Sequence, residues 1–229
     1  SGKTNYIVTV SEKESLLFAE LIQVDFDNTS YKVCTLKPST EYDGSTLSYI
    51  YSHSGVQNVK SAVENMFSTS IDYYIDFEKD KFADYYDSLG EVNYAVSSDI
   101  KYKNNKTTVP YTVRIKAGEQ VIKGSQAVNL VRYYLESGNN QSGANDILLT
   151  SLSKQLNAEN FAEKDSFFQD FVTKANTNIT VRDYAAADDK ITVLCNSQNG
   201  ISIYGAEIKY KNNKITKKTL QKAKGYFTK

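Results

Sequence analysis

The segment Val56–Val96 constrains the fold most, because helical and strand patterns alternate within it. Apolar residues spaced three and four apart first mark one helical face, at Val56, Val59, Val63, Met66 and Phe67. Tyr73–Phe77 then reads as a short strand, a second helix ends at Gly90, and Glu91–Val96 returns as a strand. Ser54 is the expected N-cap of the first helix.

The same alternation continues on both sides of this segment. Leu16–Phe26 is apolar on both faces and Tyr31–Lys37 follows a turn, which together predict a buried hairpin. Strands that alternate with helices favour an α/β protein. We therefore expect one domain over residues 1–229, a three-layer α/β/α structure with a central mixed β-sheet.

Later segments predict further hairpins and caps. Ile100–Ile115 reads as a hairpin around Asn104-Asn105, and its word IKYKNNK recurs at Ile208–Lys214. Thr180 with Asp183 forms a capping-box pattern that opens a short helix. Lys190–Cys195 is expected to be a closing strand.

Composition narrows the classes of function. The 229 residues hold 27 basic and 27 acidic side chains, so no global charge points to nucleic acid. The longest apolar run, Leu16–Ala19, is far too short to span a membrane. The chain opens at Ser1-Gly2, as a trimmed or mature form would.

Charge is uneven along the chain. Lys209–Lys229 holds eight lysines and no acid, which leaves 19 basic and 27 acidic residues, a net charge of −8, in the other 208. Such a segment can face anionic lipid headgroups or a phosphate-rich polymer. It can equally be a solvated lysine-rich helix.

The two cysteines and the one histidine suggest little chemistry. Cys34 and Cys195 each lie in an apolar run, either as two buried thiols or as a disulfide that closes most of the chain. Neither has a CxxC neighbour, which argues against zinc. His53, in a polar loop, is the only partner for a nucleophile, and no phosphate loop or GxSxG is present.

Two stretches carry a family resemblance. Ala62–Phe77 reads AVENMFSTSIDYYIDF and Ala117–Arg132 reads AGEQVIKGSQAVNLVR. These words and their order resemble the extracytoplasmic catalytic domain of the LytR–CpsA–Psr family, over most of the chain from about Glu14. The resemblance implies proteins that move glycopolymers from a polyprenyl pyrophosphate carrier onto the bacterial cell wall. It also implies an extracytoplasmic location, with a membrane anchor that precedes Ser1.

The resemblance assigns roles to three polar residues. Glu14, before Ser15 and an apolar strand, stands where the family has an aspartate that binds Mg²⁺, and carboxylate oxygen suits that ion. Arg132 matches a family arginine that contacts the diphosphate. Lys37 occupies the Pro-Arg-Asp motif region and can supply a point charge to a phosphate, though no bidentate fork.

Other family arginines are missing. Tyr134 stands where a second arginine follows Arg132, and Gln141–Asp146 lacks the family's arginine pair. Arg114 and Arg182 are the chain's only other arginines. Since removing one donor to a developing charge typically costs about 10²–10³ in rate, this pattern indicates a weakened or inactive phosphotransferase with a degenerate active site.

The resemblance also implies a cavity for the lipid. Its expected lining is Phe77, Phe82, Tyr85 and Leu89, although core packing alone would require the same residues. Three hypotheses follow: a Mg²⁺-dependent phosphotransferase, a non-catalytic module that binds polyprenyl phosphate or another apolar chain, and an envelope protein whose lysine-rich end binds an anionic polymer.

Overall fold

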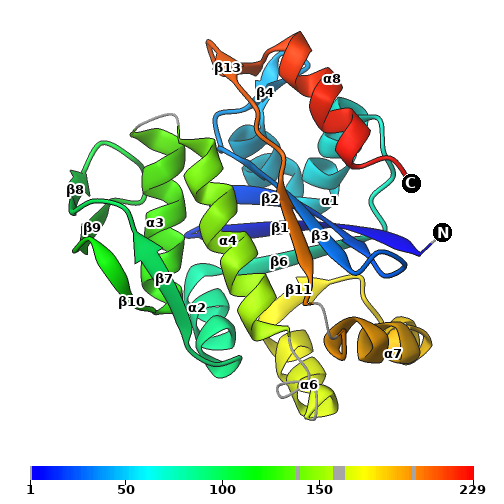
Figure 1. Cartoon of the computed structure of the whole chain (residues 1–229). Helices are drawn as coiled ribbons and strands as arrows, with labels where there is room; N and C mark the ends of the chain where they lie inside the picture. Colours follow the sequence, from blue (N-terminus) through cyan, green and yellow to red (C-terminus); the bar gives the residue numbers. More distant parts are fainter. Residues whose placement is uncertain (1, 138–139, 157–162, 198–199) are drawn as a thin grey trace.

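The computed structural model describes residues 2–137, 140–156, 163–197 and 200–229 (Figure 1). The strands are β1 (Lys3–Glu12), β2 (Ser15–Asp25), β3 (Ser30–Leu36), β4 (Glu41–Tyr42), β5 (Ser45–Thr46), β6 (Tyr73–Glu78), β7 (Val92–Val96), β8 (Ile100–Asn104), β9 (Tyr111–Ile115), β10 (Gly118–Ile122), β11 (Ala175–Thr177), β12 (Ser202–Gly205), β13 (Tyr210–Lys211) and β14 (Lys214–Ile215). The helices are α1 (Leu47–Phe67), α2 (Lys79–Ser88), α3 (Gly124–Glu136), α4 (Gln141–Gln155), α6 (Lys164–Lys174), α7 (Val181–Cys195) and α8 (Lys217–Tyr226).

A mixed six-stranded sheet forms the centre, in the order β11-β6-β1-β2-β3-β12. The predicted hairpin is present, because β2 pairs antiparallel with both β1 and β3. β6 joins β1 in parallel and β12 joins β3 in parallel. The expected α/β/α architecture with a mixed sheet is therefore confirmed.

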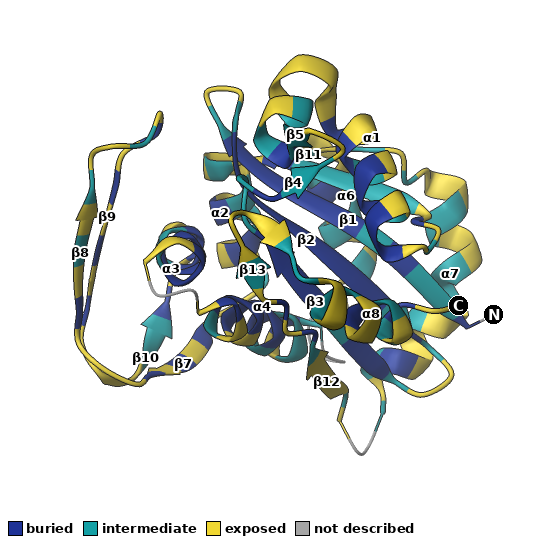
Figure 2. Ribbon diagram, turned by 90° about the horizontal axis from the view of Figure 1, so that it is seen from above, coloured by how far each residue is buried: buried dark blue, intermediate teal, exposed yellow. Residues whose placement is uncertain are grey.

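Helices cover both faces of this sheet (Figure 2). Side chains alternate along each strand, so β1 and β2 supply both layers. Ile7 and Leu21 pack on one face with Val63 of α1 and Phe227 after α8. Residues such as Val8 and Ile22 pack on the other face against α4 and α6. Two-sided burial explains why these strands lack a polar face.

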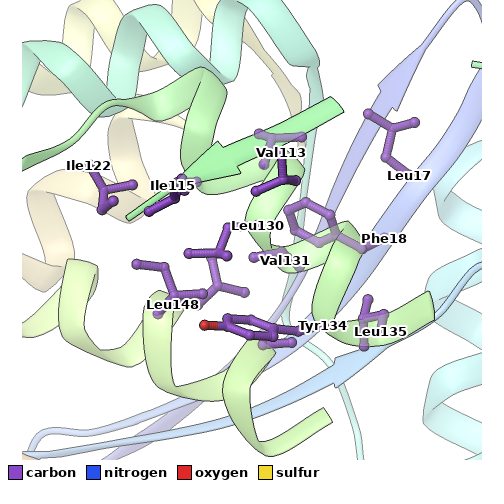
Figure 3. Close-up of a cluster of buried hydrophobic side chains, with 14 of the residues drawn as sticks. Leu17, Phe18, Val113, Ile115, Ile122, Leu130, Val131, Tyr134, Leu135 and Leu148 are labelled. Carbon is purple, nitrogen blue, oxygen red and sulfur yellow. The ribbon is translucent and has the colours of Figure 1, made fainter. Parts of the chain in front are cut away.

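A further hydrophobic cluster holds α3 between the sheet and the hairpin β8–β9 (Figure 3). Phe18 of β2, Val131 of α3, Val113 of β9 and Leu148 of α4 all belong to it. Burying four such side chains supplies roughly 1.5–3 kcal/mol each. The cluster therefore fixes α3, and with it Arg132, relative to the sheet.

Polar side chains at the start of α4 anchor that helix to the sheet. Asn145 Oδ1 accepts hydrogen bonds from the Thr35 amide and hydroxyl, both at 2.8 Å, and its Nδ2 donates to the Ala206 carbonyl. Gln141 donates to the Thr35 and Ala206 carbonyls and accepts from the Ile208 amide. Both side chains are buried. They supply the hydrogen bonds that water cannot supply to the buried backbone groups of Thr35, Ala206 and Ile208.

The helix predictions around Ser54 and Cys195 need correction. α1 begins at Leu47, with Thr46 as its N-cap, and it is interrupted at Gly55, where φ is 77°. The second part of α1 therefore begins after Gly55, one residue beyond the expected cap Ser54. The Thr180 and Asp183 capping box is confirmed, but the helix that it opens, α7, continues to Cys195, so the expected strand Lys190–Cys195 is wrong. A strong N-terminal cap outweighed the strand propensity of the β-branched residues.

The two IKYKNNK words form different turns. Asn104 pairs with Tyr111, so a six-residue loop, not an Asn-Asn turn, closes the first hairpin. In the second, Asn212 and Asn213 have φ values of 50° and 63° and join β13 to β14, which is the type I′ pattern expected of Asn-Asn.

Gly124 allows α2 and α3 to approach closely. A Cβ at this position would lie 2.6 Å from the Ala83 Cα and 2.7 Å from its carbonyl oxygen. Because both are backbone atoms, we expect Gly124→Ala to lower the free energy of unfolding by about 2–3 kcal/mol in urea denaturation. Gly225→Ala is the matched control, since a Cβ in α8 meets nothing within 4 Å, and a gain of up to about 1 kcal/mol is expected. If Gly124→Ala and Gly225→Ala change the free energy of unfolding equally, α2 and α3 do not approach closely at Gly124.

Candidate functional site

One hollow among the described residues has a volume of about 590 Å³, and we call it the basic hollow. It lies between the start of β2, the chain after β3, the tip of the hairpin β8–β9 and the end of α3. Its lining comprises Ser15, Leu16, Leu17, Lys37, Pro38, Ser39, Ser48, Tyr102, Asn104, Lys106, Thr107, Thr108, Val109, Arg132, Leu135, Glu136 and Asn213. The structure thus places Lys37 and Arg132, separated by most of α1 to α3 in sequence, at the same hollow.

Arg132 is almost fully buried, with 3% of its surface exposed. Its Nη2 donates to the Val109 carbonyl at 2.9 Å, and its guanidinium stacks 3.9 Å from the Tyr111 ring centroid. Glu136 Oε1 lies 4.0 Å from Nε, too far for a hydrogen bond. Nε and Nη1 are buried without an acceptor among the described residues, and desolvation lowers the pKa of the guanidinium. Glu136 compensates part of the positive charge, and the two donors that lack a hydrogen-bond acceptor are groups that an anionic oxygen would satisfy.

Lys37, directly after β3, also lines this hollow. Its Nζ lies 4.2 Å from the centroid of the Tyr210 ring, a cation–π contact that holds the ammonium without neutralising it. Partial burial lowers the pKa of Lys37. Within the described part of the chain no carboxylate forms an ion pair with it. Its charge is therefore open to an anionic ligand.

Glu14 lies at a different hollow, of about 450 Å³, which we call the carboxylate hollow. It is lined by Ser11, Glu14, Tyr51, Ser52, His53, Gly55, Val56, Asp76, Glu78, Lys81, Lys174 and Asn176. It lies at the carboxyl ends of the parallel strands β1 and β6, where open α/β sheets usually bind ligands. Glu14 is exposed in the β1–β2 turn with φ of 62°.

Asp76 is the best-positioned carboxylate in that hollow. Its Oδ1 accepts from the Thr9 hydroxyl at 2.8 Å and lies 2.9 Å from the Tyr51 hydroxyl. Desolvation raises the pKa of Tyr51 to about 12, so the phenol remains a donor. No group of three His, Cys, Asp or Glu side chains among the described residues is close enough to enclose a metal. One or two carboxylates such as Glu14 and Asp76 still fit Mg²⁺, which keeps several waters.

Phe77, Phe82, Tyr85 and Leu89 all line a third hollow, the apolar cavity, of about 280 Å³. It lies between the sheet and helices α2, α4 and α6, and its lining is Val8, Glu20, Ile22, Ile75, Phe77, Phe82, Tyr85, Tyr86, Leu89, Leu148, Ser151, Leu152, Gln155 and Phe171. The aromatic walls pack edge to face, with ring centroids of Phe77 and Phe82 5.6 Å apart. An apolar space of this kind suits part of a hydrocarbon chain.

Glu20 is the exception in this apolar lining. It sits in the middle of β2, 4% exposed, and its Oε1 has no hydrogen-bond partner among the described residues. Burial raises the pKa of its carboxyl from 4.5 to about 8, and no nearby cation opposes that shift. The group is therefore largely neutral near pH 7.

Of the remaining candidates, His53 lines the carboxylate hollow, and the two other arginines and the cysteines lie outside the three hollows. His53 is exposed, with its ring stacked on Tyr49 at 3.8 Å. Arg114 and Arg182 are exposed on β9 and α7. Cys34 is buried and Cys195 half-buried, and both are free thiols, so the disulfide alternative is wrong for this structure. Burial raises the pKa of both thiols, which makes them poor nucleophiles.

Sequence reasoning missed several lining residues. Glu20 could have been noticed as a lone acid in an apolar run, and Asp76 as an acid at a strand end. Asn104, Lys106 and Asn213 come from the two IKYKNNK words, whose recurrence was the only signal.

Comparisons with known proteins define the class. The LytR_cpsA_psr family profile matches residues 29–226. The fold matches TagV of B. subtilis with a TM-score of 0.72 and 18% identity, covering 98% of this chain and 95% of that one. It matches a protein of Eubacterium siraeum with a TM-score of 0.82 and 20% identity, covering 98% and 90%. A structure described as TagT bound to LIIa-WTA matches with a TM-score of 0.66 and 14% identity, covering 99% and 90%. No curated protein matches the sequence significantly.

These matches identify an extracytoplasmic cell-envelope type of domain, and the chain belongs to the LytR–CpsA–Psr family. The family resemblance inferred from the sequence is thus confirmed. Among the described residues, no helix is both long enough and apolar enough to cross a membrane.

Glu20 makes stability depend on pH. Its folded pKa is raised, so its contribution is complete below the unfolded value of 4.5 and is lost as pH rises towards about 8. We expect the free energy of unfolding to fall by about 3 kcal/mol between pH 5 and pH 7.5 on this account. In urea titrations at several pH values, Glu20→Gln should lack this fall in the free energy of unfolding. The control Glu91→Gln, on an exposed side chain, should still show it. An unchanged pH profile in Glu20→Gln would show that the carboxyl is not buried uncharged.

Proposed function

We propose that this protein takes part in attaching glycopolymers to the bacterial cell wall, by binding a polyprenyl pyrophosphate-linked precursor. The observation that carries the proposal is Arg132, whose buried Nε and Nη1 have no acceptor within the described chain beside the basic hollow. Family membership supports the substrate class. A related fold, TagT, is known with the glycopolymer ligands LI-WTA and LIIa-WTA, which supports a glycopolymer here.

In this proposal the phosphates meet Arg132 and Lys37, and the apolar chain enters the cavity lined by Phe77, Phe82, Tyr85 and Leu89. Binding of the polyprenyl chain would be stabilised by roughly 25 cal/mol for each Å² of apolar surface removed from water. The protein would act outside the cytoplasmic membrane, held there by an anchor.

Transfer chemistry in this chain is proposed to be slow or lost. Glu14 and Asp76 would hold a Mg²⁺ ion, which supplies charge stabilisation when bound, but they line a different hollow from Arg132. Binding without transfer is the second candidate. It is favoured by this separation and by the presence of a single arginine at the basic hollow.

Arg132→Gln should weaken pyrophosphate binding. Because a charged donor pair contributes about 1.5–3 kcal/mol, we expect a roughly 10- to 100-fold higher Kd for a short polyprenyl pyrophosphate in native mass spectrometry. Lys37→Gln, on a less buried side chain, should show a smaller loss, and exposed Arg182→Gln serves as the control. Unchanged affinity in both Arg132→Gln and Lys37→Gln would remove the basic hollow from the proposal.

Leu152→Phe should separate chain binding from phosphate binding. Leu152 is half-buried on α4 and lines the apolar cavity, so a larger ring fills space there. We expect the Kd of the polyprenyl ligand to rise about tenfold, while inorganic pyrophosphate affinity remains within twofold in calorimetry. Loss of both affinities together would contradict separate sites for chain and phosphate.

Glu14→Gln tests the role of the metal. Slow hydrolysis of the bound polyprenyl pyrophosphate, in which water attacks the terminal phosphorus and polyprenyl monophosphate and inorganic phosphate are released, should require Mg²⁺ in the parent protein and be absent in Glu14→Gln, with Mg²⁺-free affinity unchanged. Incubation with ligand for hours, followed by mass measurement, detects conversion. Persistent conversion with its metal requirement intact would exclude Glu14 as a ligand, and no conversion in the parent protein would select the binding module.

A further inference from the structure

The two IKYKNNK words converge on the basic hollow. Asn104 and Lys106 reach it from the hairpin β8–β9, and Asn213 reaches it from the β13–β14 turn. The segment from Ile100 to Lys116 carries five basic residues and no acid, in a chain whose net charge is zero. Positive charge is therefore concentrated in the arm that ends at the hollow.

This arm is a two-stranded ribbon with an inner and an outer face. Val113 and Ile115 point inward and are buried with α3, as Figure 3 shows. Figure 2 shows α3 between the hairpin β8–β9 and the sheet, and no other helix or strand of the described residues covers the outer face. The exposed outer side chains are Lys101, Lys103, Thr112, Arg114 and Lys116.

Charges on this outer face are left uncompensated. Lys101 stands directly opposite Arg114 in the strand register, and like charges in that position repel. Lys116 pairs with Asp99 at 2.8 Å, but no described carboxylate forms an ion pair with Lys101, Lys103 or Arg114. An anion that bridges the two strands would relieve the repulsion.

We propose that the outer face of the hairpin β8–β9 binds a linear phosphodiester polymer, as a track that leads away from the basic hollow. The proposal rests on the proposed function, since the polymer is taken to be the glycan part of the same precursor or its growing chain. Five residues of strand extend about 17 Å, long enough for more than one polymer repeat. Exposed lysines give charge attraction without a fixed geometry, which suits a flexible repeating ligand.

The absence of apolar side chains favours a polymer over a membrane. A surface that lies on lipid normally adds aromatic or aliphatic groups that enter the interface. The outer residues of these two described strands are all lysine, arginine or threonine. The outer face therefore has the charge of a membrane-binding surface but not its apolar groups. We expect its ligand to be a soluble polyanion.

The test is binding of a fluorescent poly(glycerol phosphate) oligomer, measured by anisotropy at several salt concentrations. The variant K101Q/K103Q/R114Q removes the three unpaired charges, and K217Q/K218Q/K222Q removes three exposed lysines from α8 as the matched control. We expect the first variant to raise Kd at least tenfold and to flatten the salt dependence, because fewer counterions are released. The control should remain within twofold. Thermal unfolding verifies that both variants fold.

Equal losses in the two variants, or no loss in the first, would overturn the track. So would stronger binding of the arm to vesicles of phosphatidylglycerol than to the oligomer. The short polyprenyl pyrophosphate separates this proposal from the proposed function: K101Q/K103Q/R114Q should bind it as the parent protein does. If the parent protein fails to bind that ligand but binds the oligomer through the arm, the function at the hollow is wrong and the track remains.

Discussion

The buried amide pair on α4 is the interaction on which the site arrangement depends. Gln141 and Asn145 connect α4 to Thr35 of β3 and to the backbone at Ala206, so the helix that roofs the apolar cavity is held by hydrogen bonds rather than by packing alone. A buried amide left without a partner costs about 1–3 kcal/mol. Since Gln141 and Asn145 share the Ala206 carbonyl, loss of one side chain is expected to weaken the hydrogen bonds of the other. The same segment is where the family resemblance implies arginines. Here, Gln141 and Asn145 of that segment are buried and hydrogen-bonded within the fold.

The presence of Gln141 and Asn145 where the family resemblance implies arginines changes which groups can bind a phosphate. A segment committed to holding β3 and α4 together cannot also supply cations to a phosphate in the basic hollow. Arg132 and Lys37 remain there, and Arg132 is positioned by Tyr111 and the Val109 carbonyl, both from the hairpin β8–β9. The hairpin therefore does two things at once: it orients the remaining arginine, and it carries the excess positive charge of its outer face beside the hollow.

Much of the fold followed from the sequence, because two-sided apolar strands and helical faces are strong local signals. β2, β3, β6 and α2 fall within a few residues of their expected positions. The errors concern the ends of helices: the chain is already helical from Leu47 and breaks at Gly55 rather than starting at Ser54, and α7, which Thr180 caps, continues through residues with strand propensity. The four expected cavity residues do line one cavity, but Glu14 and Arg132 line separate hollows. Single-sequence patterns hold no information on that separation.

Glu20 shows why the apolar cavity is more than a packing defect. A carboxyl in the centre of a sheet, without a cation or hydrogen-bond partner for Oε1, destabilises the charged state. In the proposed lipid-binding role, a hydrocarbon chain in the cavity beside Glu20 would desolvate the carboxyl group further, so chain binding and protonation of Glu20 would favour each other. An apolar ligand would therefore be held more tightly in mildly acidic conditions than above pH 8. In the proposed lipid-binding role, the carboxyl group that makes the protein's stability depend on pH would make binding in the apolar cavity depend on pH as well.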